Sequence, residues 1–337
     1  MSRNRAIPTT ATTYLRPLYR LLRERGHDAD ALFRLHGVDV GELGRADARV
    51  PVAVTRELLE QAQALTREPA LGLALVRHTE YTTFGGLGLA LAAGGSVRSV
   101  LERIARYHAL ISDAVTLRVE EADDSLVVVI RERSDPPPHP QSILFLIATV
   151  IGLGRLRLAG DAPPRRVVLR GIDEAGLDAA RKYFRCEVTL GDEYRVETVA
   201  GVGSRVLDGS DPEMAAMLEQ TLKVRLPDDE RPLSVQLALW LESRFPDGEP
   251  SLADAAASLH LSERSLQRRL REENLTWMQL LDDTRRTLAE RHLHAPGMSL
   301  TQLAFLLGFA DVSSFSRAFR KWYGMPASEY RRGAGKG

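Results

Sequence analysis

Residues 251–270 read SLADAAASLHLSERSLQRRL, and residues 299–319 read SLTQLAFLLGFADVSSFSRAF. The two stretches align at an offset of 48 residues as far as the turn in the middle, and of 49 beyond it. Each begins with Ser-Leu, and Asp254 and Gln302 stand three residues after the serine, a spacing typical of a capped helix start. Apolar residues then recur at helical spacing on both sides of the turn. Each stretch therefore predicts a helix-turn-helix, and the chain holds two of them.

The second helix of each unit is predicted to bury one stripe and to expose a polar face, with Ser262 and Asp311 as the caps. The buried positions are Leu266 and Leu270 in the first unit, and Phe315 and Phe319 in the second. The exposed positions are Arg264, Gln267, Arg268 and Arg271 in the first unit, and Ser313, Arg317, Arg320 and Lys321 in the second. Arginine can donate two hydrogen bonds to guanine and glutamine can pair with adenine, whereas further Arg, Lys and Ser side chains hold phosphates. The pattern therefore predicts binding to double-stranded DNA.

The segment between the two units, from Trp277 to about His292, is predicted to be one connecting helix. A helix of about sixteen residues spans roughly 24 Å, at about 1.5 Å per residue. With the packing at either end, such a helix can place two recognition helices about one duplex turn (~34 Å) apart. One chain would then read two successive major grooves.

The composition limits the other classes of partner. The 337 residues carry 45 Lys or Arg and 45 Asp or Glu, so any nucleic-acid site must be a local patch. Cys186 is the only cysteine, which excludes an internal disulfide and a metal site with several thiolate ligands. A single cysteine also indicates a reducing compartment, so we expect the protein in the cytoplasm. The longest apolar stretch, 143–153, is shorter than the ~20 residues that a spanning helix needs, so no membrane partner is expected. No cofactor and no metal are expected either.

The first two-thirds of the chain mix helices and short strands without regular alternation, which predicts an α+β domain over residues 10–205. The expected helices are 14–25, 52–78, 96–111, 141–158 and 174–184; the expected strands are 115–120, 125–131, 167–169, 187–190 and 194–199; and 81–88 is expected to be a glycine-rich turn. Residues 206–232, helical from 211 to 224, are expected to link this domain to an all-α domain over 233–333, in which two helix-turn-helix units are joined by a helix.

Aromatic and polar side chains near the middle of the first domain are candidates for a small-molecule pocket. They are Tyr81, Phe84, Arg103, Tyr107 and His108. The same spacing fits ordinary core or rim positions, and this alternative stays open. No arrangement of nucleophile and base typical of an enzyme is present in the sequence.

With these residues in view, positions 233–333 resemble the AraC/XylS family of bacterial transcription regulators. The resemblance rests on Ser251-Leu252, Ala255-Ala256, Leu261-Ser262, Leu266, Arg268, Arg285, Ser299-Leu300, Ala304, Leu307-Gly308-Phe309, Phe315-Ser316-Arg317, Phe319, Tyr323-Gly324, Pro326 and Tyr330-Arg331. It implies base contacts from Arg264, Gln267, Arg268, Val312, Ser313 and Arg317, of which Val312 can offer only methyl contact. Phosphate contacts are expected from Ser262, Arg271, Arg320 and Lys321. Two residues depart from the family pattern, because His260 and Asn274 stand where glycine is usual.

The first domain is similar to the arabinose-binding-like regulatory domain of one branch of this family. The similarity lies in Leu71-Gly72-Leu73, Phe84-Gly85-Gly86-Leu87-Gly88 and Arg106-Tyr107-His108. It implies that the first domain binds a small-molecule effector, whose identity the name of the domain does not give. It also implies that the protein is a homodimer and that, as an activator, it contacts RNA polymerase. Two other readings stay open: a first domain that only dimerises, and an enzyme fused to a helix-turn-helix module, against which the lone Cys186 argues.

Overall fold

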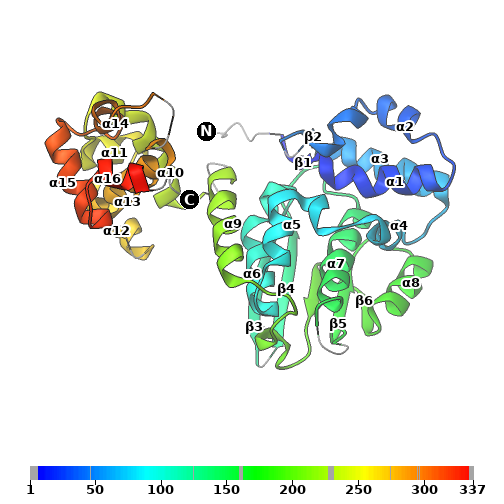
Figure 1. Cartoon of the computed structure of the whole chain (residues 1–337). Coiled ribbons are helices and arrows are strands. Elements are labelled where there is room, and N and C mark those ends of the chain that lie inside the picture. Colours follow the sequence, from blue (N-terminus) through cyan, green and yellow to red (C-terminus); the bar gives the residue numbers. More distant parts are fainter. Residues whose placement is uncertain are drawn as a thin grey trace. The chain divides into compact units, whose positions relative to one another are not determined.

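A computed structural model of the chain describes residues 7–45, 47–123, 125–158, 162–226, 231–273, 275–293, 295 and 297–333. The chain divides into two compact units, Met1–Pro227 and Asp228–Gly337, each of which is described by itself (Figure 1). The first unit thus includes residues 206–227, which the sequence placed in a linker. The mixed α+β first unit and the helical second unit have the predicted fold classes.

The first unit begins with a two-stranded sheet and a helical layer. β1 (Thr9–Ala11) pairs antiparallel with β2 (Arg49–Pro51). The helices of this layer are α1 (Arg16–Glu24), α2 (Ala29–Leu35), α3 (Val52–Thr66), α4 (Leu71–Leu75) and α5 (Gly85–Ala92), with 3-10 turns η1 (Thr12–Leu15), η2 (Val40–Gly44), η3 (Val76–His78) and η4 (Tyr81–Phe84). Leu18, Leu21 and Leu22 of α1 are buried in its hydrophobic core.

Two local expectations for this layer are wrong. The helix expected over 52–78 is broken after Thr66, because Arg67 takes a left-handed backbone with φ +51° and Pro69 disfavours helix in the residue before it. The segment 81–88, expected to be a turn, forms η4 and the start of α5. A Cβ at Gly88 would lie 1.7 Å from the Tyr81 carbonyl oxygen, so this glycine serves close packing inside a helix rather than a turn.

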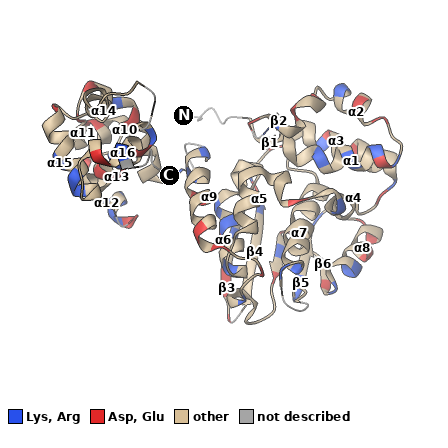
Figure 2. Cartoon of the chain, in the orientation of Figure 1, with Lys and Arg blue, Asp and Glu red and all other residues tan. Residues whose placement is uncertain are grey.

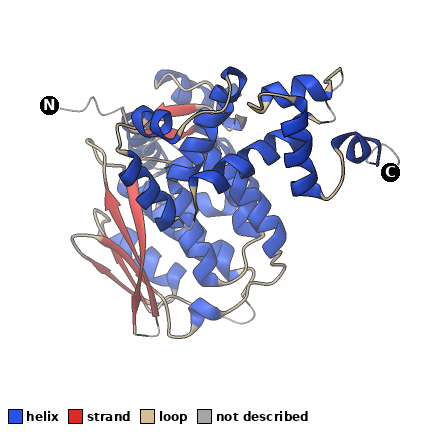
Figure 3. Cartoon of the chain, turned by 90° about the vertical axis from the view of Figure 1, so that its left-hand side faces the viewer, coloured by secondary structure: helices blue, strands red, loops and turns tan. Residues whose placement is uncertain are grey.

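A five-stranded sheet forms the second layer, in the order β3-β4-β7-β5-β6. All neighbouring strands are antiparallel except β5 and β6, which are parallel. Its elements are β3 (Val115–Ala122), β4 (Ser125–Glu132), β5 (Arg166–Leu169), β6 (Glu187–Leu190) and β7 (Tyr194–Glu197), and the helices packed on it are α6 (Val97–Tyr107), α7 (Pro140–Arg155) and α8 (Glu174–Phe184). Figure 3 shows these helices on one side of the strands.

Helix α9 (Pro212–Arg225) completes the first unit. Asp211 caps its first turn, and the helix packs against α5. Leu222 and Leu226 are buried in the same hydrophobic core as α1 and α3. The segment that was expected to connect the two domains is therefore structurally part of the first one.

The second unit is a single helical core. Its helices are α10 (Leu233–Arg244), α11 (Leu252–Ser258), α12 (Glu263–Glu272), α13 (Trp277–His292), α14 (Leu300–Leu306), α15 (Val312–Tyr323) and α16 (Ala327–Gly333), with a 3-10 turn η7 at Phe245–Asp247. The sequence analysis gave no separate helix at α10 or α16. Glu273, just after α12, accepts hydrogen bonds from the backbone amides of Leu233 and Ser234 and so caps α10.

Candidate nucleic-acid interface and ligand cavity

Both helix-turn-helix units begin with the predicted caps. The Ser251 hydroxyl accepts from the amide of Asp254 at 3.1 Å, and the Asp254 carboxylate accepts from the amide of Ser251 at 3.2 Å. Ser299 and Gln302 make the same reciprocal pair in the second unit. The Ser251 hydroxyl also donates to the Asp254 carboxylate at 2.6 Å, and this bond is the largest cause of the lowered pKa of that carboxyl, followed by the bond from the Ser251 amide. The capping boxes fix where each first helix starts.

The two turns of the repeat both have a left-handed residue at the same position, although the residues there differ. His260 has φ +54°, and Gly308, its counterpart at an offset of 48, has φ +73°. His260 is exposed, whereas a Cβ at Gly308 would lie 2.9 Å from Phe245 Cδ1 and 3.0 Å from the Gly248 carbonyl oxygen. The first turn thus accepts a side chain at a conformational cost, and the second has no room for one. Asn274, the other departure, lies outside the described residues.

Helix α12 presents its predicted face to solvent. Its cap is Ser262, whose hydroxyl accepts from the amide of Ser265, and Leu266 and Leu270 are fully buried below. The side chains predicted to contact DNA, Arg264, Gln267, Arg268 and Arg271, are all exposed. Figure 2 marks Lys and Arg positions of the chain in blue. Arg268 has one described ionic neighbour, Glu272, at 4.0 Å. The four positions are therefore free to contact a partner.

Helix α15 repeats this arrangement. Asp311 accepts from the amide of Ser314 at 2.7 Å, which is the largest cause of the lowered pKa of that carboxyl, and Phe315 and Phe319 are buried. Ser313, Arg317, Arg320 and Lys321 are exposed and Val312 is half-buried. Arg317 donates to the Ser314 hydroxyl at 3.2 Å, and Lys321 lies 3.3 Å from Asp282 of α13.

Arg285 of α13 joins the connecting helix to the turn of the second unit. Its side chain is 6% exposed and its guanidinium lies 4.3 Å from the ring centre of Phe309. It donates to the carbonyl oxygens of Leu307 and Gly308 and pairs with Glu249 at 2.8 Å. The family resemblance singled out this arginine, but only the structure gives its partners.

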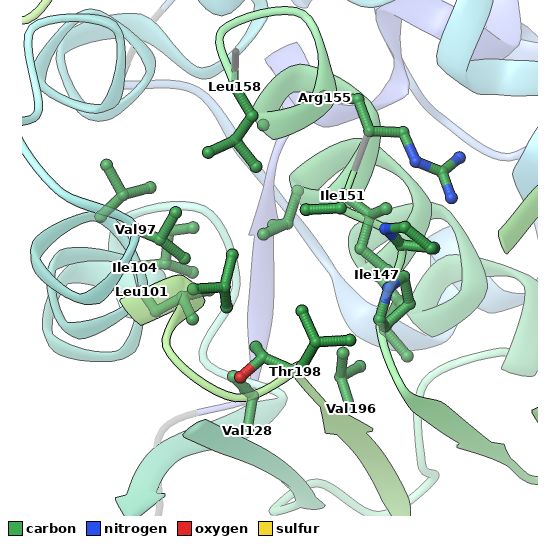
Figure 4. Close-up of a pocket in the computed structure, with 18 of the residues that line it drawn as sticks. Val97, Leu101, Ile104, Val128, Ile147, Ile151, Arg155, Leu158, Val196 and Thr198 are labelled. Atoms are coloured by element: carbon green, nitrogen blue, oxygen red, sulfur yellow. The ribbon is translucent and has the colours of Figure 1, made fainter. Parts of the chain in front are cut away.

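The first unit contains a cavity between α6, α7 and the large sheet (Figure 4). Its space, including the part open to solvent, is about 930 Å³. Figure 4 shows side chains of α6 (Val97, Leu101, Ile104), α7 (Ile147, Ile151) and the strands (Val128, Val196) facing this space. The walls are almost wholly aliphatic.

A second cavity shares lining residues with the first, and its space, including the part open to solvent, is about 650 Å³. Three of the five candidate effector residues line it, namely Tyr81, Phe84 and His108. Thr149 also lines it, although its sequence pattern was not interpreted as part of a site. A signal was available, because Thr149 is the only residue with a polar side chain in the apolar stretch 143–153.

The structure places the other two candidates, Arg103 and Tyr107, outside both cavities. They bind Glu219 of α9 instead: Tyr107 donates to it at 2.9 Å and Arg103 at 3.4 Å, with Arg106 at 3.2 Å. Burial alone would raise the pKa of Glu219, but the Tyr107 hydroxyl and the arginines lower it. Burial and the contact with Glu219 raise the pKa of Tyr107. This cluster attaches α9 to α6.

Among the described residues, no group of three or more His, Cys, Asp and Glu is arranged to hold a metal ion. None of the described helices is long and apolar enough to span a membrane.

Comparison with known proteins gives matches over both units. The family model for the arabinose-binding domain of AraC transcription regulators matches residues 26–196, and a helix-turn-helix domain model matches 255–333. The transcriptional regulator VirS of Mycobacterium tuberculosis is 30% identical, over 92% of this chain and 93% of its own length. The ornithine utilization regulator of Pseudomonas aeruginosa is 29% identical, over 94% and 95%. The crystal structure of the regulator CdpR from P. aeruginosa covers 94% of this chain and 98% of its own, with 23% identity and a TM-score of 0.47.

Proposed function

The chain belongs to the AraC family of helix-turn-helix transcription regulators, and from this premise we propose how it reads DNA and responds to an effector. Helices α12 and α15 enter two successive major grooves of one DNA site. Base contacts come from Arg264, Gln267, Arg268, Val312, Ser313 and Arg317. Phosphate contacts come from Ser262, Arg271, Arg320 and Lys321.

The observation that carries this proposal is the repeated exposed face of α12 and α15. Residues 232–337 hold fourteen Lys or Arg against twelve Asp or Glu, a surplus of only two, so bulk charge does not explain DNA binding. The basic and amide side chains are instead gathered on the second helix of each unit, with apolar residues buried beneath. Such a face matches the donors and acceptors of the major groove.

The first unit supplies regulation in this proposal. Val100 and Ile104 of α6 line both cavities, while Arg103 and Tyr107 on the same helix hold α9. Helix α9 is the last helix before the DNA-binding unit. A small molecule that binds more tightly when α6 has one conformation would favour that conformation. Because α6 holds α9, this would shift the position of α9 and change the affinity for DNA. The regulator acts in the cytoplasm as a homodimer, and as an activator it contacts RNA polymerase.

The test is a selection of genomic DNA fragments by the full-length protein at near-physiological salt. The wild type is expected to enrich sites with two short sequence blocks about one helical turn apart. The variant Arg268→Ala/Arg317→Ala is expected to lose this enrichment. Its matched control, Arg244→Ala/Arg332→Ala, removes the same charge from exposed positions outside α12 and α15 and is expected to keep it.

Enrichment by the double variant equal to that of the wild type would contradict the proposed base contacts. A first unit that only dimerises is the remaining alternative. It predicts a dimer whose DNA binding and thermal stability are unchanged across a broad panel of small molecules.

A further inference from the structure

The two cavities share six lining residues, three of them on α7. The residues that line both are Val100, Ile104, Leu146, Val150, Gly154 and Leu207. None of these six carries a hydrogen-bonding side chain. A site of this kind binds ligands chiefly by removing apolar surface from water.

Two uncharged polar side chains of this lining, Thr149 and His108, have a buried atom without a described partner. Thr149 is 3% exposed and His108 is 6% exposed, and both line the second cavity. Among the described residues, neither Thr149 Oγ1 nor His108 Nδ1 has a hydrogen-bond partner. A buried polar group without a partner is costly, so these two atoms mark where a ligand would gain hydrogen bonds. Burial lowers the pKa of His108 to about 4, so its ring is neutral at physiological pH.

The two arginines that line the cavities, Arg155 and Arg157, are held by backbone carbonyl groups, although Arg155 Nε has no described partner. Arg155 donates to the carbonyl oxygens of Tyr183 and Phe184, at the end of α8. Figure 4 shows its guanidinium turned away from the aliphatic side chains. Arg157 donates to the carbonyl oxygens of Asp208 and Leu91. Both guanidinium groups are held by these carbonyl groups, so a ligand carboxylate beside Thr149 and His108 would have to draw one of them away to gain a charge partner. Burying an unpaired charge is strongly unfavourable.

We propose that the effector is an uncharged, mainly apolar molecule of medium chain length with one hydrogen-bonding group, which contacts Thr149 and His108. The proposal rests on the proposed role of the first unit as an effector sensor and names the class of its ligand. A sugar does not fit, because most of its hydroxyl groups would be buried against aliphatic walls without partners.

Binding of three probes to the full-length protein tests the chemical class. The probes are 1-octanol, octanoate at pH 7 and L-arabinose, measured by calorimetric titration and thermal unfolding. We expect 1-octanol to bind and to raise the melting temperature. We expect octanoate, with the same chain length and a negative charge, to bind at least tenfold more weakly, and L-arabinose not to bind.

Two variants test the location. Thr149→Val keeps the shape of the wall and removes the hydroxyl, so 1-octanol is expected to bind about fivefold more weakly, as expected for one lost hydrogen bond. Thr66→Val is the control, since its hydroxyl bonds to the Ala62 carbonyl and lines neither cavity. Gly154→Leu fills the shared part of the cavity and is expected to abolish binding. A Cβ at Gly154 meets no described atom within 4 Å, and leucine favours helix, so this variant is expected to fold.

Equal or tighter binding of octanoate, binding of L-arabinose, or no binding of 1-octanol would each overturn the proposal. So would 1-octanol binding that Gly154→Leu leaves unchanged. The fragment selection with wild type and recognition-helix variants uses none of these probes, so a failure there counts against the DNA-reading proposal alone. If 1-octanol binds as expected but leaves DNA affinity unchanged, the ligand class stands and the effector role fails.

Discussion

Arg285 Nε donates a hydrogen bond of 2.9 Å to the carbonyl oxygen of Leu307. The donor lies on the connecting helix α13, and the acceptor lies directly after α14, at the turn of the second helix-turn-helix unit. The guanidinium is also enclosed by the rings of Phe245 and Phe309, at 5.1 and 4.3 Å from their centres. This contact fixes the connecting helix to the turn that precedes α15.

Replacing Arg285 by leucine is expected to lower the free energy of unfolding by about 3 kcal/mol, because two buried carbonyl groups lose their donor. Arg285→Lys is expected to recover only part of this lost stability, since one ammonium group cannot replace the planar guanidinium group with its several N–H donors. Urea unfolding of the full chain, followed by circular dichroism, measures both. Arg286→Leu, at an exposed position on the same helix, is the control. Equal stability of the two leucine variants would contradict the structural role of Arg285.

Base and phosphate contacts are expected to respond differently to mutation. Arg268→Ala and Arg317→Ala are each expected to cost about 1–3 kcal/mol on a specific site and to relax preference at single base positions. Lys321→Ala is expected to weaken binding to all sequences alike and to reduce the salt dependence by about one phosphate. Binding titrations on specific and random duplexes at several salt concentrations separate these effects. An unchanged salt slope for Lys321→Ala would argue against its phosphate contact.

Substitution of the left-handed residue is expected to have opposite effects on stability in the two turns of the repeat. His260→Gly is expected to raise the free energy of unfolding by up to about 1 kcal/mol, because glycine adopts the left-handed backbone without strain. Gly308→His is expected to lower it by more than 2 kcal/mol, since the added Cβ would overlap Phe245 and the Gly248 carbonyl. Thermal unfolding of both variants provides the comparison. A similar loss of stability in both variants would show that the two turns do not differ in the room they leave for a side chain.

Glu219→Gln is expected to loosen α9. Arg103 has a side chain only 11% exposed, and the substitution removes the carboxylate that it faces. We expect a loss of about 1–3 kcal/mol in stability and faster hydrogen exchange over 212–225. Glu213→Gln, exposed on the first turn of the same helix, is the control. Unchanged exchange in α9 would mean that the cluster does not hold this helix.

His108 predicts a pH dependence of stability. Burial lowers its pKa from 6.5 to about 4 in the folded protein, so between these values the unfolded chain binds more protons. The free energy of unfolding is therefore expected to fall as the pH decreases from about 7 to about 4, by on the order of 3 kcal/mol from this residue. In His108→Leu this contribution is absent. The difference in stability between wild type and variant should change between pH 7.5 and 5; a constant difference would contradict the burial effect.

The second unit was largely predictable because its signals are local. Caps at Ser251, Ser262, Ser299 and Asp311 and apolar residues at helical spacing each lie within one or two turns of chain. The first unit was predictable only in outline. Its hairpin and longest helices follow local patterns. The break after Thr66 had a local signal in Pro69, which the helical pattern outweighed, whereas the helix starting at Gly85 depends on packing against the distant helix α9.

The candidate ligand site shows the same limit. Tyr81, Phe84 and His108 were predicted from residue type, and the structure brings them to one cavity. Arg103 and Tyr107 share the helix α6 with residues of its wall but face Glu219, more than a hundred positions further along the chain. The spacing of residues along one helix does not predict a contact with a residue so far away in the sequence.

The burial of Leu222 and Leu226 in the first unit determines where the chain can be divided. A chimeric regulator that joins residues 1–227 to the DNA-binding half of another protein would retain the whole effector unit. A junction before α9 would instead remove Glu219 and leave apolar surface uncovered. Sensor exchange between such regulators should therefore place the junction after α9.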